Sequence, residues 1–244
     1  MRFPTTHAPP ATEIPLNLAI FDLDNTLLDG DSDHLWGQFL VRIGVVDGPT
    51  YERENDRFFR EYQAGTMNSG EFLRFALKPL KDNDPVSLQR WHGQFMEEEI
   101  RPVILPAGRE LIALHKARGD QVLIITATNR FITGPIAAEL GVDELLATEP
   151  AMRGGGYTGE VEGQPCFQSE KIERLQQWMR VGNRSFTQTW FYSDSINDRP
   201  LLNHVQHPVA VDPDSLLEQH ARTRGWPVAS LRRESAHRIF ERVT

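Results

Sequence analysis

The chain has 244 residues and a formal net charge of −8, from 26 basic and 34 acidic side chains. Its basic residues form no block, so we expect no nucleic-acid partner. No apolar run reaches the roughly 18 residues that a membrane-spanning helix needs, so we expect no membrane partner either. The single cysteine, Cys166, cannot form an internal disulfide, which predicts a reducing, cytoplasmic environment.

The N-terminal residues 1–15 contain four prolines and lack the apolar segment of a signal peptide, so we expect a disordered lead-in. An apolar run then rises to Phe21 and predicts a buried parallel strand. Asp22 and Asp24 follow at the end of that strand, two positions apart, so an extended backbone directs both carboxylates to one side. A divalent cation would relieve their repulsion. The alternative is a strand that simply ends in an Asp-rich turn.

Residues 31–101 are predicted to be helical throughout. Apolar residues recur there at helical spacing, with breaks near 44–49, 65–70 and 79–85. This pattern predicts about four helices that form a bundle inserted into the chain. We expect Trp36 and Trp91 to belong to the core of this bundle rather than to contact a substrate.

Strands and helices alternate after Pro106, which predicts a parallel sheet with right-handed crossovers. The predicted strands are 121–126, 142–147, 189–193, 208–211 and 226–231, the predicted helices are 108–118, 131–140, 169–180 and one from about 215, and 152–161 is a predicted hairpin. We therefore expect a discontinuous core domain of residues 16–30 and 102–231. The charged segment 232–244 is expected to be a flexible tail.

Three later features have the residue types of a phosphate site. Thr126 ends a predicted strand, Lys171 begins a predicted helix, and Asp194 and Asp198 follow another strand. Each has a simpler interpretation: a strand-terminal threonine, a solvated lysine, and a helix N-cap. A cation is disfavoured in the first turn of a helix, so Lys171 is expected there only in contact with an anion or with water.

Taken together, these motifs resemble those of the haloacid dehalogenase (HAD) superfamily. The Asp-x-Asp-x-Thr motif, the strand-terminal hydroxyl, the lysine and the acidic cluster occur in that order. The resemblance implies a Rossmann-like α/β core with an inserted helical C1 cap, and the phosphoserine phosphatase-like branch, subfamily IB, is the most similar. Ser193 and Ser195 replace two glycines of that branch, and 126–128 reads Thr-Ala-Thr where the branch has Ser-Gly-Gly.

The resemblance also implies a mechanism. Asp22 would attack phosphorus and form an aspartyl-phosphate, and Asp24 would protonate the leaving alkoxide and later activate water. Asp22, the backbone carbonyl of Asp24, and Asp194 would hold Mg²⁺. Thr126 and Lys171 would bind phosphate oxygens.

Supporting roles follow from the same resemblance. Asp198 would support the metal or orient the lysine, and Thr26 would hold the turn that aims the second aspartate. Asn197 and the backbone amide at Ala127 would touch the phosphate. Dehalogenases lack an acid at position 24, since a halide needs no proton, so the pattern favours a phosphomonoester hydrolase.

Asp31 matches a glutamate that binds the substrate amine in phosphoserine phosphatases. The arginine that clamps the serine carboxylate there aligns with Ala76, although a shift of one turn would give that role to Arg74. A site that keeps the amine contact but loses the clamp fits L-histidinol phosphate, whose ring Asp33 or Trp36 would receive. We therefore expect a small amino-alcohol phosphate, histidinol phosphate ahead of phosphoserine. A non-catalytic phosphate-binding protein is the remaining alternative, and either a monomer or a homodimer is compatible with the sequence.

Overall fold

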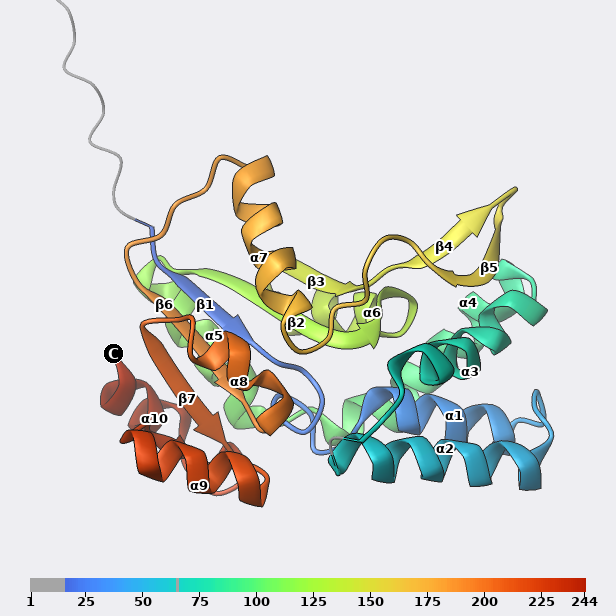
Figure 1. Cartoon of the computed structure of the whole chain (residues 1–244), viewed down its shortest axis with the longest axis horizontal. Helices are drawn as coiled ribbons and strands as arrows, with labels where there is room; N and C mark the ends of the chain where they lie inside the picture. The colour runs from blue at the N-terminus through green and yellow to red at the C-terminus, as the bar shows by residue number, and fades with distance from the viewer. Residues whose placement is uncertain (1–15, 65) are drawn as a thin grey trace, which may run out of the picture.

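The computed structural model describes residues 16–64 and 66–244 of the chain. The predicted lead-in, residues 1–15, and Gly65 lie outside this part. A parallel sheet forms the centre of the molecule, and helices cover both of its faces (Figure 1). This arrangement confirms the predicted Rossmann-like α/β fold.

Six parallel strands form the central sheet in the spatial order β3-β2-β1-β6-β7-β8. Their bounds are Leu18–Phe21 (β1), Gln121–Asn129 (β2), Glu144–Thr148 (β3), Thr189–Ser193 (β6), His207–Val211 (β7) and Val228–Ala229 (β8). Phe21 of β1 is paired with Ile124 of β2 on one side and with Tyr192 of β6 on the other. Asp22, the residue after β1, therefore lies at the middle of the carboxyl edge of the sheet, between β2 and β6.

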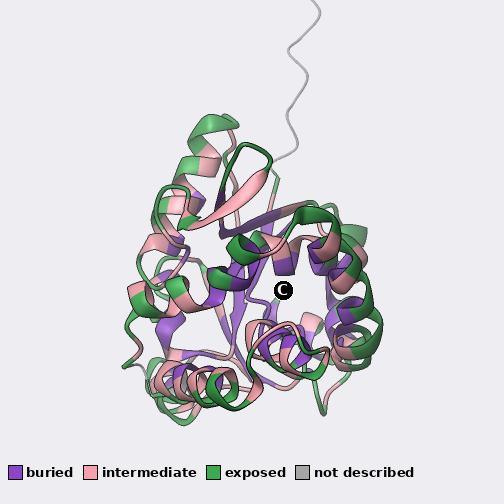
Figure 2. Cartoon of the chain, turned by 90° about the vertical axis from the view of Figure 1, so that its right-hand side faces the viewer, coloured by how far each residue is buried: buried purple, intermediate pink, exposed green. Residues whose placement is uncertain are grey.

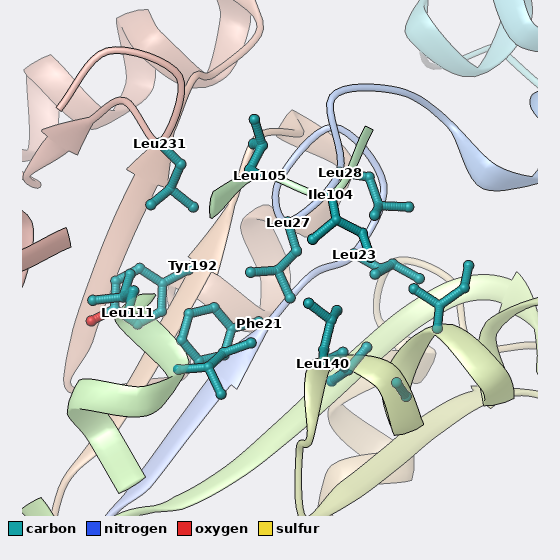
Figure 3. Packing of buried hydrophobic residues seen from close by; sticks show 14 of the residues in the cluster. Phe21, Leu23, Leu27, Leu28, Ile104, Leu105, Leu111, Leu140, Tyr192 and Leu231 are labelled. Atoms are coloured by element: carbon teal, nitrogen blue, oxygen red, sulfur yellow. The ribbon is translucent and has the colours of Figure 1, made fainter. Parts of the chain in front are cut away.

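Successive side chains of each strand pack on opposite faces of the sheet, as the period of two requires. One face carries Phe21 and is covered by α5 (Pro106–Arg118), α6 (Arg130–Leu140) and α10 (Ala236–Val243). The other carries Ile20 and is covered by α7 (Glu170–Val181), α8 (Arg199–Leu202) and α9 (Ser215–Arg224). On the first face the Phe21 ring stacks on Tyr192, with centroids 4.6 Å apart (Figure 3). Helices bury both faces of the sheet, which explains the near-continuous apolar sequences of its strands.

Every secondary-structure element that the structure describes within residues 32–103 is a helix. These are α1 (Ser32–Arg42), α2 (Gly48–Gln63), α3 (Ser69–Asp82), α4 (Pro85–Phe95), a π-helical turn at Met96–Ile100 and a 3₁₀ turn at Arg101–Val103. Trp36 is buried against Phe39 and Phe95, as predicted, and it also meets Phe131 of α6. The apolar contacts therefore continue from these helices into the sheet domain, and the division of the chain into core and cap stays a prediction.

A separate antiparallel hairpin consists of β4 (Pro150–Arg153) and β5 (Gly156–Val161), close to the predicted 152–161. Tyr157 and Val161 pack against Leu77 and Leu80 of α3. This hairpin therefore joins the sheet domain to the inserted helices a second time. Figure 2 shows the resulting burial, with buried residues along the strands and exposed residues on the outward faces of the helices.

Short-range signals in the sequence account for most helix ends. Asp31 accepts a hydrogen bond from the backbone amide of His34 and caps α1, and Asn68 does the same for α3. Gly119 and Gly141 end α5 and α6 in the left-handed region, with φ of 90° and 69°, where a side chain would be strained. No helix in the part of the chain that the structure describes has the length and hydropathy needed to cross a membrane.

Strand β2 is longer than predicted, and Thr126 lies inside it rather than at its end. The pairing with β3 continues from Ile125 to Asn129 through a register shift. The Thr148 hydroxyl of β3 also donates to the carbonyl oxygen of Ala127 at 2.7 Å. These contacts with β3 keep the chain extended where the apolar pattern has already ended.

The expectation of a flexible tail at 232–244 is wrong for most of that segment. Residues Ala236–Val243 form α10, which packs along α5 and buries Ala236, Ile239 and Val243. The Trp190 indole N–H also donates to the carbonyl oxygen of Val243 at 2.8 Å. Although most other positions of this helix are charged, its buried apolar residues lie along one side. That apolar side is enough to bind a short helix to the sheet domain.

This packing predicts that Ile239→Ala lowers the free energy of unfolding by about 2–5 kcal/mol, because it leaves a cavity at a fully buried site. Urea denaturation of the purified protein measures the change. Arg238→Ala, on the exposed side of the same helix, is the control and should change stability by less than about 0.5 kcal/mol. Equal stability of both variants would mean that α10 does not contribute to the fold.

Candidate active site

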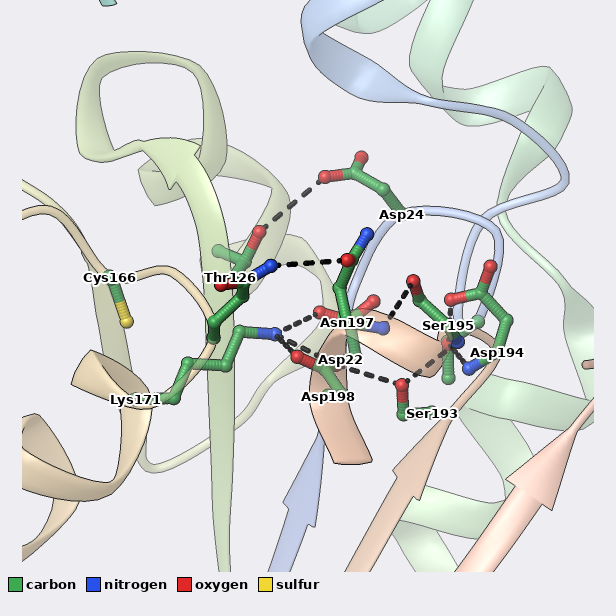
Figure 4. Close-up of polar contacts among 12 residues, drawn as sticks. Asp22, Asp24, Thr126, Cys166, Lys171, Ser193, Asp194, Ser195, Asn197 and Asp198 are labelled. Carbon is green, nitrogen blue, oxygen red and sulfur yellow. Dashed lines mark hydrogen bonds and ion pairs between the residues drawn. The ribbon is translucent and has the colours of Figure 1, made fainter. Parts of the chain in front are cut away.

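The predicted site residues gather at the carboxyl edge of the sheet (Figure 4). Asp22 directly follows β1, Asp194 directly follows β6, and Thr126 lies on β2 beyond its last pair with β1. Parallel strands direct their carboxyl ends to one edge, where open α/β sheets bind ligands. Lys171 reaches the same place from the start of α7, although 149 positions separate it from Asp22.

Lys171 forms the centre of a buried ion cluster. Its Nζ lies 2.9 Å from Oδ1 of Asp22 and 2.6 Å from Oδ1 of Asp198. The lysine side chain is only 2% exposed, which excludes the interpretation that it is solvated. The Ser193 hydroxyl donates to Oδ2 of Asp198 at 2.8 Å and holds that carboxylate toward the lysine. The Asp198 carboxylate is therefore placed to orient Lys171. This contact agrees with one of the two supporting roles expected for Asp198.

The ionisation of this centre is set by burial and by the nearby carboxylates. Burial raises the pKa of Asp22 to about 7, because Lys171 only partly offsets desolvation and the adjacent acids. Desolvation likewise raises the pKa of Asp194 well above its ordinary value, and Asp22 and Asp198 raise it further. Desolvation lowers the pKa of Lys171, but the two carboxylates outweigh it, so this pKa lies above the ordinary value. The cluster thus holds more carboxylates than its lysine can neutralise.

The donor atoms here suit a hard divalent cation. Asp22 and Asp194 present carboxylate oxygens. Burial, together with the neighbouring acids, raises the pKa of both groups and so disfavours their ionised forms, which a cation would stabilise. Within residues 16–64 and 66–244, no three His, Cys, Asp or Glu side chains are grouped closely enough to hold a metal ion. The expected Mg²⁺ ligands need no such group, since they are two carboxylates, one backbone carbonyl and waters.

Asp24 is held by three donors. Its Oδ1 accepts from the backbone amide of Ser32 at 2.7 Å, and its Oδ2 accepts from the hydroxyls of Thr128 at 2.8 Å and Thr126 at 3.4 Å. The amide of Thr128 donates in turn to the Thr126 hydroxyl at 3.1 Å. Both threonines therefore fix the direction of Asp24, and the phosphate contact of Thr126 stays a prediction.

Thr26 joins the first loop to the loop after β6. Its hydroxyl donates to Oδ1 of Asp194 and accepts from the Asp194 amide, both at 3.1 Å. The side chain is fully buried. Thr26 therefore positions an expected metal ligand and has no direct access to a substrate.

Asn197 connects the site with the inserted helices. Its Nδ2 donates to the carbonyl oxygen of Tyr62, at the end of α2, and its Oδ1 accepts from Gln168, both at 3.3 Å. The Tyr62 ring also lies against Phe167, with centroids 6.2 Å apart. The predicted phosphate contact of Asn197 is therefore untested, while its contact with the inserted helices is present.

A pocket opens above Asp22 and Asp24, between α1, α2 and β2. Its lining consists of Asp22, Asp24, Asp31, Asp33, His34, Asn55, Phe58, Phe59, Tyr62, Met67, Phe72, Thr126, Ala127 and Thr128. It thus has four carboxylates and an aromatic wall, and no arginine or lysine belongs to this lining of described residues. Burial and the neighbouring acid Asp24 raise the pKa of Asp31 to about 7, and the same causes, with Asp31, raise the pKa of Asp33. The acids of this pocket therefore disfavour one another's ionised forms.

Only some of the predicted substrate-binding residues line the pocket. Asp31 and Ala127 line the pocket, whereas the Arg74 side chain is exposed on α3 and is not part of the lining. Trp36, considered for the substrate ring, is 1% exposed and packs in the apolar core. Of the two ring candidates, only Asp33 faces the pocket.

Two functional side chains were not foreseen. Thr128 holds Asp24, and Ser193 holds Asp198. A strand spacing of two places Thr128 on the same side as Thr126, so the sequence contained the signal for it. Ser193 was considered only as a replacement for glycine. Its hydroxyl contact could not be predicted, because it depends on how the loop after β6 places Asp198.

The sequence model of the haloacid dehalogenase-like hydrolase family matches residues 19–203 of the chain. The chain belongs to this family. A histidinol-phosphatase of Neisseria meningitidis is 43% identical over 220 residues, which cover 88% of this chain and 99% of that one. A phosphoserine phosphatase of Mycobacterium tuberculosis is 29% identical and covers 88% of this chain and 70% of that one. The chain is therefore an HAD-family phosphatase.

Solved structures show the same fold. A Bordetella pertussis protein of unknown function is 40% identical, with a TM-score of 0.85 over 89% of this chain and all of that one. A substrate-bound phosphoserine phosphatase has a TM-score of 0.70 at 19% identity over 95% of this chain and all of that one. The second likeness concerns the fold alone.

Proposed function

We propose that this phosphatase is a Mg²⁺-dependent phosphomonoesterase that acts through an aspartyl-phosphate on Asp22. The Asp22 carboxylate attacks phosphorus, the bond from phosphorus to the alcohol oxygen breaks, and water later cleaves the acyl-phosphate. Lys171, 2.9 Å from Asp22, offsets negative charge beside the nucleophile. A bound cation would favour the ionised form of Asp22, which burial disfavours.

We assign the proton transfers to Asp24. It gives a proton to the leaving alkoxide and takes one from the attacking water. The Thr128 hydroxyl, 2.8 Å from Oδ2, suits both states, because a hydroxyl donates to the carboxylate and, after rotation, accepts from the acid. The Ser32 amide fixes the other oxygen in either state.

Asp22, Asp194 and the backbone carbonyl of Asp24 would hold the Mg²⁺. When bound, the ion neutralises charge on the phosphoryl oxygens and aligns them with the nucleophile. Thr26 keeps Asp194 turned toward this position through its two hydrogen bonds. Asp198 is directed at Lys171 and so acts indirectly.

We further propose that the substrate is a cationic amino-alcohol phosphate, L-histidinol phosphate in particular. The carrying observation is the pocket itself, with Asp31 and Asp33 in its wall and no arginine or lysine among its described lining residues. The carboxylate of phosphoserine would meet these acids without a counter-charge, whereas an ammonium group and an imidazole ring both suit them. Phe58, Phe59 and Phe72 supply the apolar surface against which a ring would pack.

Asp33 is the better candidate for the ring. Asp31 already caps α1 through the amide of His34, at 2.9 Å. Asp33 makes no side-chain hydrogen bond or ion pair within the part of the chain that the structure describes, although it lines the pocket. A carboxylate in that position is available to a ligand. The 43% identity to a histidinol-phosphatase supports the same substrate.

The test is kcat/KM for L-histidinol phosphate and for L-phosphoserine, each with Mg²⁺ and with excess chelator. We expect hydrolysis to require Mg²⁺ and histidinol phosphate to be preferred by tenfold or more, which is about 1.4 kcal/mol. A tenfold preference for phosphoserine would reverse the substrate proposal. Full activity in chelator would refute the metal.

Asp33→Asn gives a sharper prediction. Loss of one charge-assisted contact should lower kcat/KM for histidinol phosphate by about 10- to 100-fold. Hydrolysis of an aryl phosphate without a cationic group should change little, because that substrate offers no cation to Asp33. Asp47→Asn is the matched control, since Asp47 is an exposed acid at the start of α2 that makes no side-chain cap. Equal loss on both substrates would assign Asp33 to the structure of the site instead.

We also propose a cytoplasmic location for this protein. A cytoplasmic location is supported by Cys166, a free, fully buried thiol whose pKa burial raises to about 12. A lone cysteine has no disulfide partner within the chain, so the fold gains no stability from an oxidising compartment. For the oligomeric state, both a monomer and a homodimer remain compatible with the fold.

A further inference from the structure

Arg232, just after the sheet ends, contacts three acceptors from two other segments. Its Nε lies 2.6 Å from Oδ1 of Asp29, and its Nη1 lies 3.1 Å from the carbonyl oxygen of Asn25 and 3.2 Å from Oδ2 of Asp212. Asn25 and Asp29 belong to the loop after β1, and Asp212 follows β7. The Arg232 side chain is 27% exposed, so most of it is covered by these segments.

The position of Arg232 is itself fixed by its own end of the chain. Asp212 has φ of 42°, a left-handed conformation that aspartate tolerates, and its carboxylate turns back toward the C-terminal segment. There it accepts from the Ser230 hydroxyl and from the amide of Leu231 at 2.9 Å. Helix α10 then anchors the segment against α5. Arg232 therefore projects from a rigid base.

The loop that Arg232 holds carries the reacting groups. Asn25 has φ of 57°, and its amide donates to the carbonyl oxygen of Gly30 at 2.9 Å, which closes the loop. Asp24 and Thr26 flank Asn25, so rotation of that peptide would re-aim both the Asp24 carbonyl and the Thr26 hydroxyl. The amide of Asp29 donates to Val103 at 2.7 Å, where the helical insertion returns to the sheet.

We propose that Arg232 is a positioning residue, which fixes the 24–29 loop and thereby the aim of Asp24 and of the Asp24 carbonyl. The inference rests on the roles proposed above for Asp24. The Asp29 carboxylate is 60% exposed, so this ion pair alone adds little to stability. The contact that matters is the one to the Asn25 carbonyl, because it acts on the backbone between two functional residues. Residue 232 lies beyond the family match, which ends at 203.

The first test compares Arg232→Gln, Arg232→Lys and the control Arg233→Gln. Arg233 is exposed and makes no side-chain hydrogen bond or ion pair with any residue that the structure describes. We expect Arg232→Gln to lower kcat about tenfold with KM within about twofold, since the loop aims reacting groups rather than binding substrate. Lysine keeps the charge but not the planar fork, so Arg232→Lys should fall between. A kcat within twofold of wild type for Arg232→Gln would overturn the proposal.

The second test does not depend on activity. Amide hydrogen exchange of residues 25–30 should be faster in Arg232→Gln than in wild type and Arg233→Gln, while the strands keep their protection. Unchanged exchange in the loop, or faster exchange spread over all strands, would contradict local positioning. If the wild-type protein fails to hydrolyse phosphomonoesters, the proposed function is wrong, and the exchange result still decides whether Arg232 holds the loop. If Arg232→Gln does not fold, Arg232→Lys supplies the same comparison.

Discussion

Asp22→Asn is expected to abolish turnover, with kcat lower by about 10⁴-fold or more, as loss of a catalytic nucleophile typically causes. An amide is not a usable nucleophile toward phosphorus, and no other described carboxylate occupies the same place directly after β1. Asp24, the nearest in sequence, is bound to Ser32 and Thr128. Hydrolysis of histidinol phosphate measures the loss. The mass of acid-quenched protein should gain a phosphoryl group in the wild type only.

The Asp22→Asn protein should remain folded, which makes its kinetics interpretable. The pKa of Asp22 rises from an ordinary 3.8 to about 7 on folding in the absence of metal. A raised carboxyl pKa means that the unfolded state ionises first, so stability falls as pH rises from about 4 to 7. Asparagine removes that penalty, and metal-free stability at pH 7 should not decrease. Turnover within tenfold of wild type would refute the covalent mechanism.

Much of this site was predictable because parallel strands end at one edge. The apolar runs that end near Asp22 and Asp194 predict strands in one sheet, and the sheet topology then brings the two acids together. Lys171 was a candidate from the sequence, since a lysine at a helix start is expected to contact either an anion or water. Its two partners, Asp22 and Asp198, were not predictable from local sequence, because the contacts span 149 and 27 positions.

Two predictions, the end of strand β2 and the flexible tail, were wrong because tertiary contacts determine the structure at both places. Thr126 was expected to end its strand, but β3 extends the pairing to Asn129, an interaction that no local pattern records. The segment 232–244 was expected to be flexible because it is charged, yet three apolar side chains at helical spacing bind it to α5. In both places tertiary contacts override the local composition.

A buried polar network beneath the site was also invisible in the sequence. The ring nitrogens of His115 lie 2.7 Å from Oδ2 of Asp120 and 2.8 Å from the Tyr192 hydroxyl. Burial alone would raise the pKa of Asp120, but hydrogen bonds from His115, Arg118 and Asn17 outweigh it and lower the pKa to about 2. Tyr192 stacks on Phe21, so the network supports the strand that presents Asp22.

Lys171→Met is expected to have the largest effect on stability. It removes the one cation that contacts both Asp22 and Asp198 and leaves two buried carboxylates facing each other. Removing one partner of a buried ion pair typically costs 3–5 kcal/mol, so we expect about that loss in metal-free urea denaturation at pH 7. Lys78→Met is the control, because Lys78 is 69% exposed, and its pair with Asp82 should contribute less than about 1 kcal/mol.

The cause of the Lys171→Met loss can be separated from simple truncation of a side chain. If repulsion between the carboxylates dominates, adding Asp198→Asn should recover much of the lost stability, because only one of the two facing carboxylates then remains. The added substitution would not restore turnover, because the charge beside the nucleophile is still missing. A double variant no more stable than Lys171→Met would instead indicate that the lysine stabilises the site by packing.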